Sequence, residues 1–298
     1  MIQRTLVALA LLLALASPAA PAGVTRNPGG LSIAVDEREA YPGGLLTIRL
    51  HSRRPIRGIV YGILDGRRCP AFSSADGLRV LVPVPVTFTP GRTTLGVEIR
   101  SSRGRDRFAV PVTIARREYA AREIVLPDDK REMAASPAGV RDGRLLQQYL
   151  RTVSPRQEWR GAFRPPVDAP PGATFGAAET YAGVAAVDSR MDAIYGEYHR
   201  GLDYEVAAGT QVKAPAAGIV LFAGTLALSG KTVVVDHGQG LVSVFSHLAS
   251  TSVPQGEWLE AGRVVGESGN TGIAAVPHLH WAVYLLGVAI DPRVTERL

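Results

Sequence analysis

The chain has 298 residues and a net charge of +6, which favours an anionic partner such as a bacterial wall or a membrane surface, although a solvated basic face would give the same excess. One cysteine is present, so an intrachain disulfide is excluded as a source of stability. Aromatic residues make up only 6% and do not interleave with basic stretches, which argues against a nucleic-acid partner.

The N-terminal segment has the pattern of a secretory signal peptide. Arg4 precedes the apolar run LVALALLLALA, residues 6–16, and the small residues SPAAPAG follow it. At about 1.5 Å per residue this run is too short to span a bilayer, and no cysteine near the junction offers a lipid attachment point. We predict a signal peptide over residues 1–22, cleaved after Ala22 or after Ala16, and a periplasmic or extracellular protein without a stable membrane anchor.

Residues 31–114 have the pattern of a series of short strands. Alternating segments such as LSIAV, LLTIRLHS and FAVPVTIA recur about every ten residues, with turn material such as YPGG and SRGRD between them. The pattern predicts an immunoglobulin-like β-sandwich domain over residues 23–116. We expect no catalytic residue in it, with His51 at the surface and Cys69 as a small buried side chain.

Charged residues and prolines interrupt this pattern over residues 117–160. Four side chains there fall at helical spacing: Leu145, Leu146, Tyr149 and Leu150. We predict a connector with one short helix around residues 141–152. Apolar segments bounded by glycine return over residues 161–298, among them KTVVVDHG, where we place His237 in a solvated turn. The predicted fold class is therefore mainly β, with a β-rich C-terminal domain.

Two short motifs hold three of the six histidines: HRGLD at residues 199–203 and HLH at residues 278–280. Alternate side chains of a strand share a face, so His278 and His280 point into one cleft, about 6 to 7 Å apart. Gly201 argues against a helix in the first motif, which places that motif on a loop entering a strand. Imidazoles and a carboxylate with one open position are typical of a catalytic zinc site.

These motifs, with SHL at residues 246–248 between them, resemble the zinc-dependent peptidoglycan endopeptidases of the lysostaphin type, peptidase family M23. TFG at 174–176, AGTQVKAPAAGIVLFAG at 208–224 and SGNTGIAAVPHLHW at 268–281 extend the resemblance. It implies an M23 peptidase domain of the duplicated hybrid motif type over residues 161–298. Residues 177–198 depart from the family, in which a shorter stretch with a basic residue after the glycine is expected.

The resemblance also implies roles for individual residues. By position, His199, Asp203 and His280 would bind Zn2+, and His247 and His278 would be the two catalytic histidines. Water activated by the zinc would attack the peptide bond, with one of these histidines as general base. An imidazole suits this task because its pKa of about 6.5 lets it take and return a proton. Tyr195 or Tyr198 could donate to the oxyanion, or could be a surface residue.

We therefore predict a secreted, monomeric zinc metalloendopeptidase that hydrolyses cross-links between peptidoglycan peptide stems. One alternative is a non-catalytic M23-like regulator that binds and activates a cell-wall amidase; another is a secreted adhesin or polysaccharide-binding module. The bond cleaved could be a D-alanine linkage to a diamino acid or a glycine bridge. The N-terminal domain could target the wall, block the cleft or act as a spacer.

Overall fold

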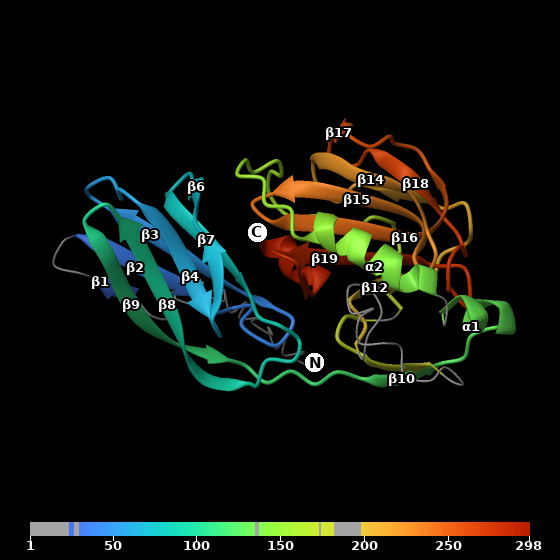
Figure 1. The fold of residues 1–298 in the computed structure, drawn as a ribbon, viewed down its shortest axis with the longest axis horizontal. Coiled ribbons are helices and arrows are strands. Elements are labelled where there is room, and N and C mark those ends of the chain that lie inside the picture. Colours follow the sequence, from blue (N-terminus) through green and yellow to red (C-terminus); the bar gives the residue numbers. More distant parts are fainter. Residues whose placement is uncertain (1–23, 27–29, 135–136, 173, 182–197) are drawn as a thin grey trace, which may run out of the picture.

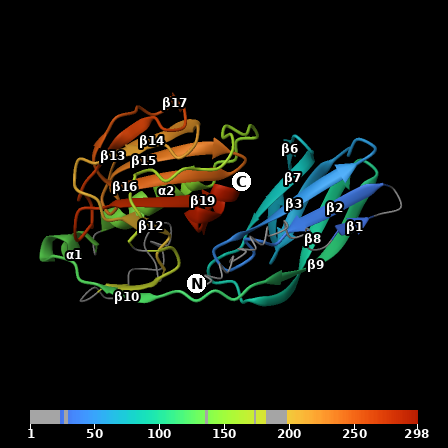
Figure 2. The same cartoon turned by 180° about the vertical axis from the view of Figure 1, so that it is seen from behind.

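The computed structural model describes residues 24–26, 30–134, 137–172, 174–181 and 198–298. Figure 1 and Figure 2 show a smaller N-terminal body of strands beside a larger C-terminal one, with the segment that carries both helices lying along the larger body. The predicted mainly β fold class is confirmed. The proposed signal peptide, residues 1–22, lies outside the described residues, and the domain boundaries stay a prediction.

The N-terminal body consists of two antiparallel sheets, in the orders β1-β2-β3-β7-β6 and β5-β4-β8-β9 (Figure 1). Their strands are β1 (Val24–Arg26), β2 (Leu31–Asp36), β3 (Leu45–Ser52), β4 (Ile59–Leu64), β5 (Arg67–Pro70), β6 (Phe72–Ser74), β7 (Gly77–Pro83), β8 (Gly91–Ser101) and β9 (Gly104–Ile114). The longer strands coincide with the predicted segments, whereas β1, β5 and β6 are short strands that the sequence did not indicate. The immunoglobulin type of this sandwich stays a prediction.

Alternation of apolar residues produces the core of this sandwich. In β2, for example, Leu31, Ile33 and Val35 are buried while the residues between them are partly exposed. Cys69 lies fully buried in the same core, as predicted, and burial raises the pKa of its thiol to about 12. His51 is exposed, also as predicted. The N-terminal body therefore has a hydrophobic core of its own.

The five-stranded sheet also packs its outer face against the C-terminal body. Leu45 of β3 and Leu81 of β7 belong to the core of the C-terminal body. Their neighbours Leu46 and Val82 belong to the sandwich core, because successive side chains of a strand point to opposite faces. One sheet therefore contributes to two cores.

A half-buried arginine strengthens this contact between the two bodies. Arg79 of β7 donates to the side-chain oxygens of Gln157 and Gln239, at 2.9 and 2.8 Å. Its guanidinium carbon also lies 5.2 Å from the ring centre of the buried Trp159, a cation–π contact. Apolar packing and charge-assisted hydrogen bonds thus join the two bodies at one interface.

The connector contains β10 (Ala121–Ile124), α1 (Asp128–Ala134) and α2 (Pro137–Leu150). The predicted helix corresponds to α2, which begins earlier than expected because Pro137 suits the first turn of a helix. Strand β10 and helix α1 were not predicted. Leu146 and Leu150 of α2 are buried against one face of the C-terminal sheet, which α2 crosses in Figure 1. Among the described residues, neither helix is long and apolar enough to cross a membrane.

Nine strands form the main sheet of the C-terminal body. Its path is β12-β19-β16-β15-β14-β17; β13 pairs with β18, β18 also with β16, and β20 with β19. The strands are β12 (Gly201–Tyr204), β13 (Gln211–Lys213), β14 (Gly218–Leu226), β15 (Gly230–Gly238), β16 (Leu241–Thr251), β17 (Trp258–Leu259), β18 (Val264–Ser268), β19 (Leu279–Leu285) and β20 (Val288–Ile290). The 3-10 helix η2 (Pro292–Arg297) follows, and β11 (Ala178–Tyr181) pairs with β10 outside this sheet.

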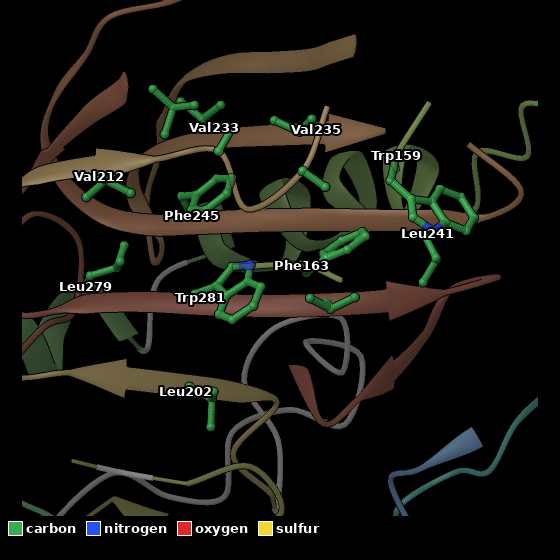
Figure 3. Packing of buried hydrophobic residues seen from close by; sticks show 14 of the residues in the cluster. Trp159, Phe163, Leu202, Val212, Val233, Val235, Leu241, Phe245, Leu279 and Trp281 are labelled. Atoms are coloured by element: carbon green, nitrogen blue, oxygen red, sulfur yellow. The ribbon is translucent and has the colours of Figure 1, made fainter. Parts of the chain in front are cut away.

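The main sheet separates two clusters of buried side chains. Figure 3 shows the larger cluster, to which β12, β13, β15, β16 and β19 contribute Leu202, Val212, Val233, Val235, Leu241, Phe245, Leu279 and Trp281. The residues that alternate with them, such as Val244 and Ala282, point to the other face and pack with α2. Along these strands, alternate side chains therefore point either into the larger core or toward the face that the connector covers.

His237 lies in β15 and is fully buried, so the prediction of a solvated turn is wrong. Its Nδ1 donates to the carbonyl oxygen of Ala217 at 2.8 Å, which leaves Nε2 to accept from the Ser243 hydroxyl at 2.8 Å. Burial lowers the pKa of His237 to about 4, so the ring is neutral at neutral pH. Both ring nitrogens are satisfied within the fold, and this histidine is structural.

The shared interface predicts that a single substitution on the sandwich destabilises the whole chain. Leu81→Ala should lower the free energy of unfolding by about 2 to 5 kcal/mol, because it leaves a cavity between the bodies. Denaturant unfolding followed by tryptophan fluorescence measures this change. The control is Val125→Ala, at a side chain that is 68% exposed, which should have little effect. Equal stability of the two variants would contradict the interface.

Candidate functional site

Antiparallel pairing of β12 with β19 sets Asp203 directly opposite His280. Their neighbours Leu202 and Trp281 point into the core, so Asp203 and His280 emerge together on the opposite face. His199 lies just before β12, where its side chain reaches the same point. The first motif is thus a loop that enters a strand, as predicted. The side chains of His199, Asp203 and His280, which come from two distant parts of the sequence, therefore lie next to one another.

The three side chains converge within hydrogen-bond distance of one another. Nε2 of His199 lies 2.9 Å from Oδ1 of Asp203 and 3.1 Å from Nδ1 of His280, and the latter two atoms are 2.8 Å apart. Ligands of a tetrahedral zinc ion at about 2.0 to 2.1 Å lie roughly 3.3 Å from one another. The three atoms therefore form a triangle close to the size that a metal ion requires.

The protonation of these groups also suits a cation. Nδ1 of His199 lies 3.1 Å from the carbonyl oxygen of Thr174, which can only accept, so Nδ1 carries the proton and the Nε2 lone pair faces Asp203. Burial opposes ionisation of Asp203, but His199 and His280 outweigh it and lower its pKa well below the ordinary value. A lone pair facing a carboxylate oxygen requires a proton or a metal ion between them, and the residues fit a metal.

Gly201 of the first motif is needed for packing. A Cβ atom at this position would lie 2.8 Å from Cε1 and 2.9 Å from Nε2 of His280, closer than real Cβ contacts occur. The absence of a side chain lets the His280 ring lie against β12. The glycine that argued against a helix in the sequence therefore makes room for one of the three converging side chains.

His247 and His278 complete the group of histidines. Their ring centres lie 4.8 Å apart, and the ring centre of His247 lies 6.2 Å from that of His280. Nδ1 of His247 donates to the carbonyl oxygen of Thr271 and Nδ1 of His278 to that of Val276, both at 2.8 Å. Each ring therefore has the same tautomer, with Nε2 left to accept a proton. Nε2 of His278 lies 3.8 Å from Oδ1 of Asp203.

Two glycine-containing turns hold His247 in place. Its backbone N–H donates to the carbonyl oxygen of Ser229 at 2.8 Å, and its φ of 62° lies in the left-handed region that non-glycine residues seldom adopt. A Cβ on Gly230 would lie 2.4 Å from the carbonyl carbon of Thr271, so the two turns pack backbone against backbone. Burial, and then the neighbouring rings of His278 and His280, lower the pKa of His247 to about 3.

The five predicted site residues line one cavity of about 150 Å3. Its other lining residues comprise three charged side chains, Arg122, Glu179 and Glu205, and an apolar group, Ile124, Ile273, Ala274, Ala275 and Val276. Ile273 to Val276 lie in the quoted segment SGNTGIAAVPHLHW, whereas Arg122 and Ile124 were not singled out in the sequence, because the connector strand that carries them has no motif. The alternation of Arg122 and Ile124 in AREI is the only local signal that they share a face.

The two tyrosines considered in the sequence do not join this group. Tyr195 lies outside the described residues. Tyr198 forms an isolated bridge with Ala178 and lines a separate cavity, together with Arg67, Arg200 and Tyr284. Most of the stretch that departs from the family pattern, residues 182–197, also lies outside the described residues.

The C-terminal body that carries this cavity is similar to known proteins. Residues 197–292 match the profile described as Peptidase family M23. The DD-carboxypeptidase/endopeptidase Mpg of Neisseria meningitidis serogroup B is 35% identical over 94 residues, 32% of this chain and 22% of that protein. The peptidoglycan DD-endopeptidase ShyA of Vibrio cholerae is 33% identical over 93 residues, 31% of this chain and 22% of that protein. The chain therefore spans about a fifth of the length of these relatives.

One solved structure is similar over most of the chain. A candidate M23 peptidase from Pseudomonas aeruginosa aligns with a TM-score of 0.63 and 26% identity, over 87% of this chain and 96% of that chain. The similarity therefore extends beyond the matched C-terminal segment into the N-terminal sandwich and the connector.

The convergence of His199, Asp203 and His280 predicts that a metal ion stabilises the folded chain. Protein stripped with a chelator should melt at a higher temperature once zinc is added, because only the folded state brings the three ligands together. Asp203→Ala should abolish this rise, whereas Asp168→Ala, at an exposed aspartate of the same body, should keep it. Differential scanning fluorimetry measures both, and a full rise in Asp203→Ala would rule out the site.

Proposed function

Because residues 197–292 belong to peptidase family M23, we propose that this chain is a zinc metalloendopeptidase that hydrolyses peptide cross-links of bacterial peptidoglycan. One observation carries the proposal: two further histidines, whose Nδ1 atoms are held by backbone carbonyls, line the same cavity as the three converging side chains. A site that only bound a metal for stability would be closed by a fourth ligand and would not need such bases.

In this proposal Nε2 of His199, Oδ1 of Asp203 and Nδ1 of His280 hold zinc. When bound, zinc supplies Lewis-acid chemistry, polarising the scissile carbonyl and making water more acidic. His247 and His278 would face the reacting groups, and Nε2 of His278 is the base that takes a proton from the attacking water, because burial lowers the pKa of His247 to about 3 and makes that ring a weak base. The resulting imidazolium then donates a hydrogen bond to the oxyanion or returns the proton to the leaving amine.

The backbone carbonyls of Thr271 and Val276 orient these two rings. Each carbonyl holds an Nδ1–H, so the proton-accepting nitrogen of each ring is kept at Nε2 throughout the cycle. The strained backbone of His247 costs roughly 1 to 3 kcal/mol, which the surrounding turns offset by over-determining its position. The arrangement is therefore prepared for proton transfer before substrate arrives.

The substrate class rests on the relatives and on the shape of the cavity. ShyA is named as a peptidoglycan DD-endopeptidase and Mpg as a DD-carboxypeptidase/endopeptidase, and this chain is 33% and 35% identical to them over 93 and 94 residues. The apolar residues from Ile273 to Val276 and the charged groups of the lining could accommodate a short peptide with alanine side chains and charged ends. We also propose that the chain acts as a monomer in the periplasm or outside the cell, after removal of residues 1–22.

The alternative of a non-catalytic amidase regulator has no observation in its favour. Such a protein needs the cleft to bind its partner but does not need metal ligands or proton-accepting groups in it. Here three side chains suited to a metal and two oriented histidines line one cavity. An adhesin built from two β-rich domains would likewise leave these five side chains without a role.

Digestion of defined muropeptides tests the proposed activity. Zinc-loaded full-length protein should convert cross-linked muropeptides into single stems with one new amino terminus each, and a chelator should stop the conversion. Mass spectrometry of the products distinguishes a D-alanine linkage to a diamino acid from a glycine bridge. Binding to cell walls with no product from either substrate would contradict a peptidase and support an adhesin.

Two histidine substitutions separate the proposed ligand from the proposed base. His280→Ala should lose zinc and activity together, because a ligand is removed. His278→Ala should keep stoichiometric zinc yet lose about 10²- to 10⁴-fold in turnover, as expected for a general acid–base group. Zinc content after gel filtration and initial rates on one muropeptide measure both effects. Retention of zinc by His280→Ala would show that the ligand assignment is wrong.

A further inference from the structure

Arg122 of the connector reaches the candidate metal ligands. Strands β10 and β11 pair in parallel, with Arg122 beside Glu179 in register. Nε of Arg122 donates to Oε1 of Glu179 at 2.8 Å, and Nη2 contacts the same oxygen. Nη2 also donates to Oδ2 of Asp203 at 3.0 Å. One guanidinium therefore bridges two carboxylates that come from different parts of the chain.

The two oxygens of Asp203 consequently face different partners. Oδ1 faces His199 and His280, whereas Oδ2 accepts from Arg122. A carboxylate whose second oxygen is held by a donor presents the first oxygen in one orientation and cannot rotate to bind a metal through both. The planar, forked guanidinium suits this task better than a flexible ammonium group would.

We propose that Arg122 is a positioning residue for Asp203, and that Glu179 is the counter-charge that allows a cation to lie beside a metal site. The inference rests on the proposed function, because Asp203 is positioned for the metal of that site. It makes the connector a part of the active site instead of a spacer between two domains.

The charges around the site explain why the arginine needs a partner. A zinc ion with two neutral imidazoles and one carboxylate keeps about one formal positive charge. Arg122 adds another, which would repel the ion, and Glu179 cancels it. The Glu179 side chain is only 5% exposed and that of Arg122 33%, so solvent screens this pair weakly. Because Glu179 neutralises the charge of Arg122, this arginine can donate its hydrogen bond to Asp203 without adding net positive charge beside the metal site.

The position of the site on the sheet explains why a connector strand can reach it. Asp203 and His280 point away from the core, toward the face that α2 and the connector cover. Ile124, two residues after Arg122, lines the same cavity. Lys130 of α1 donates to the carbonyl oxygen of Gly272 at 2.6 Å, next to the residue that orients His247. The connector is therefore held against both sides of the cavity.

A charge-neutral double substitution tests the proposal without substrate. Arg122→Met with Glu179→Gln removes both opposite charges and the hydrogen bond to Asp203, so the net charge of the site is unchanged. The zinc dissociation constant, measured by competition with a chromophoric chelator, should rise about 10- to 100-fold. Glu179→Gln alone should also weaken zinc binding, because Arg122 then lacks its counter-charge. Arg122→Lys, which keeps a donor and the charge while Glu179 stays in place, should bind zinc far more tightly than the double variant.

A second ion pair, at the boundary between the sandwich and the connector, provides the matched control. Arg116 and Glu118 form an exposed pair at 3.6 Å, and the double substitution Arg116→Met with Glu118→Gln should leave zinc affinity unchanged. Melting of the chelator-treated variants checks that each folds; if the Arg122–Glu179 double variant does not, Glu179→Gln and Arg122→Lys decide the matter.

Wild-type zinc affinity in the Arg122–Glu179 double variant would overturn the positioning role. If that variant also turned over faster at saturating zinc, Arg122 would obstruct the cavity instead. Because zinc affinity is measured without substrate, a chain that binds zinc but cleaves no peptide would refute the proposed peptidase and leave the positioning role standing.

Discussion

The cross-strand pair of Asp203 and His280 is the interaction on which the candidate site depends. Antiparallel pairing places the two residues opposite each other, and the pleat points both away from the core. A slip of one residue in either strand would turn one of them into the core and expose apolar side chains in exchange. The large core shown in Figure 3 therefore specifies the register, and the register places the candidate ligands.

The same pleat explains why the connector and the sandwich belong to the functional unit. The face of the sheet that carries the ligands is the face against which the connector packs, so side chains of the connector lie at the edge of the cavity. The sandwich in turn places Leu45 and Leu81 in the core on the other side of the sheet. Both faces of one sheet are therefore tied to segments that precede it in the chain, and a change in the sandwich can reach the site through these contacts.

Much of the fold and of the candidate site could be predicted from short-range pattern. The longer strands coincide with alternating apolar segments, and the two histidine motifs contain the residues that converge. The elements missed are those without a periodic signal, such as β10 and α1. His237 was assigned to a solvated turn because glycines lie beside it, yet it is buried and satisfied by Ala217, just before β14, and by Ser243 of β16. Arg122 and Glu179 carry no motif, and Thr174 and Thr271 lie in segments that resemble the family but act through their backbone carbonyls, so only the neighbours in space of these four groups give them a role.

The sequence by itself determined the composition of this protein's site, that is, which imidazoles and which carboxylate are available. It predicted His278 and His280 on one strand, whereas β19 begins at Leu279 and His278 lies just before it, in an isolated bridge with Gly269. Alternation and motif spacing depend only on residues close together in the chain, so they can be recognised in the sequence alone. The tertiary structure decided which groups surround those residues, which nitrogen of each ring carries the proton, and that the connector reaches Asp203. Those features depend on pairings between distant segments, whose geometry is set by the packing of the entire sheet and not by any single stretch of the chain.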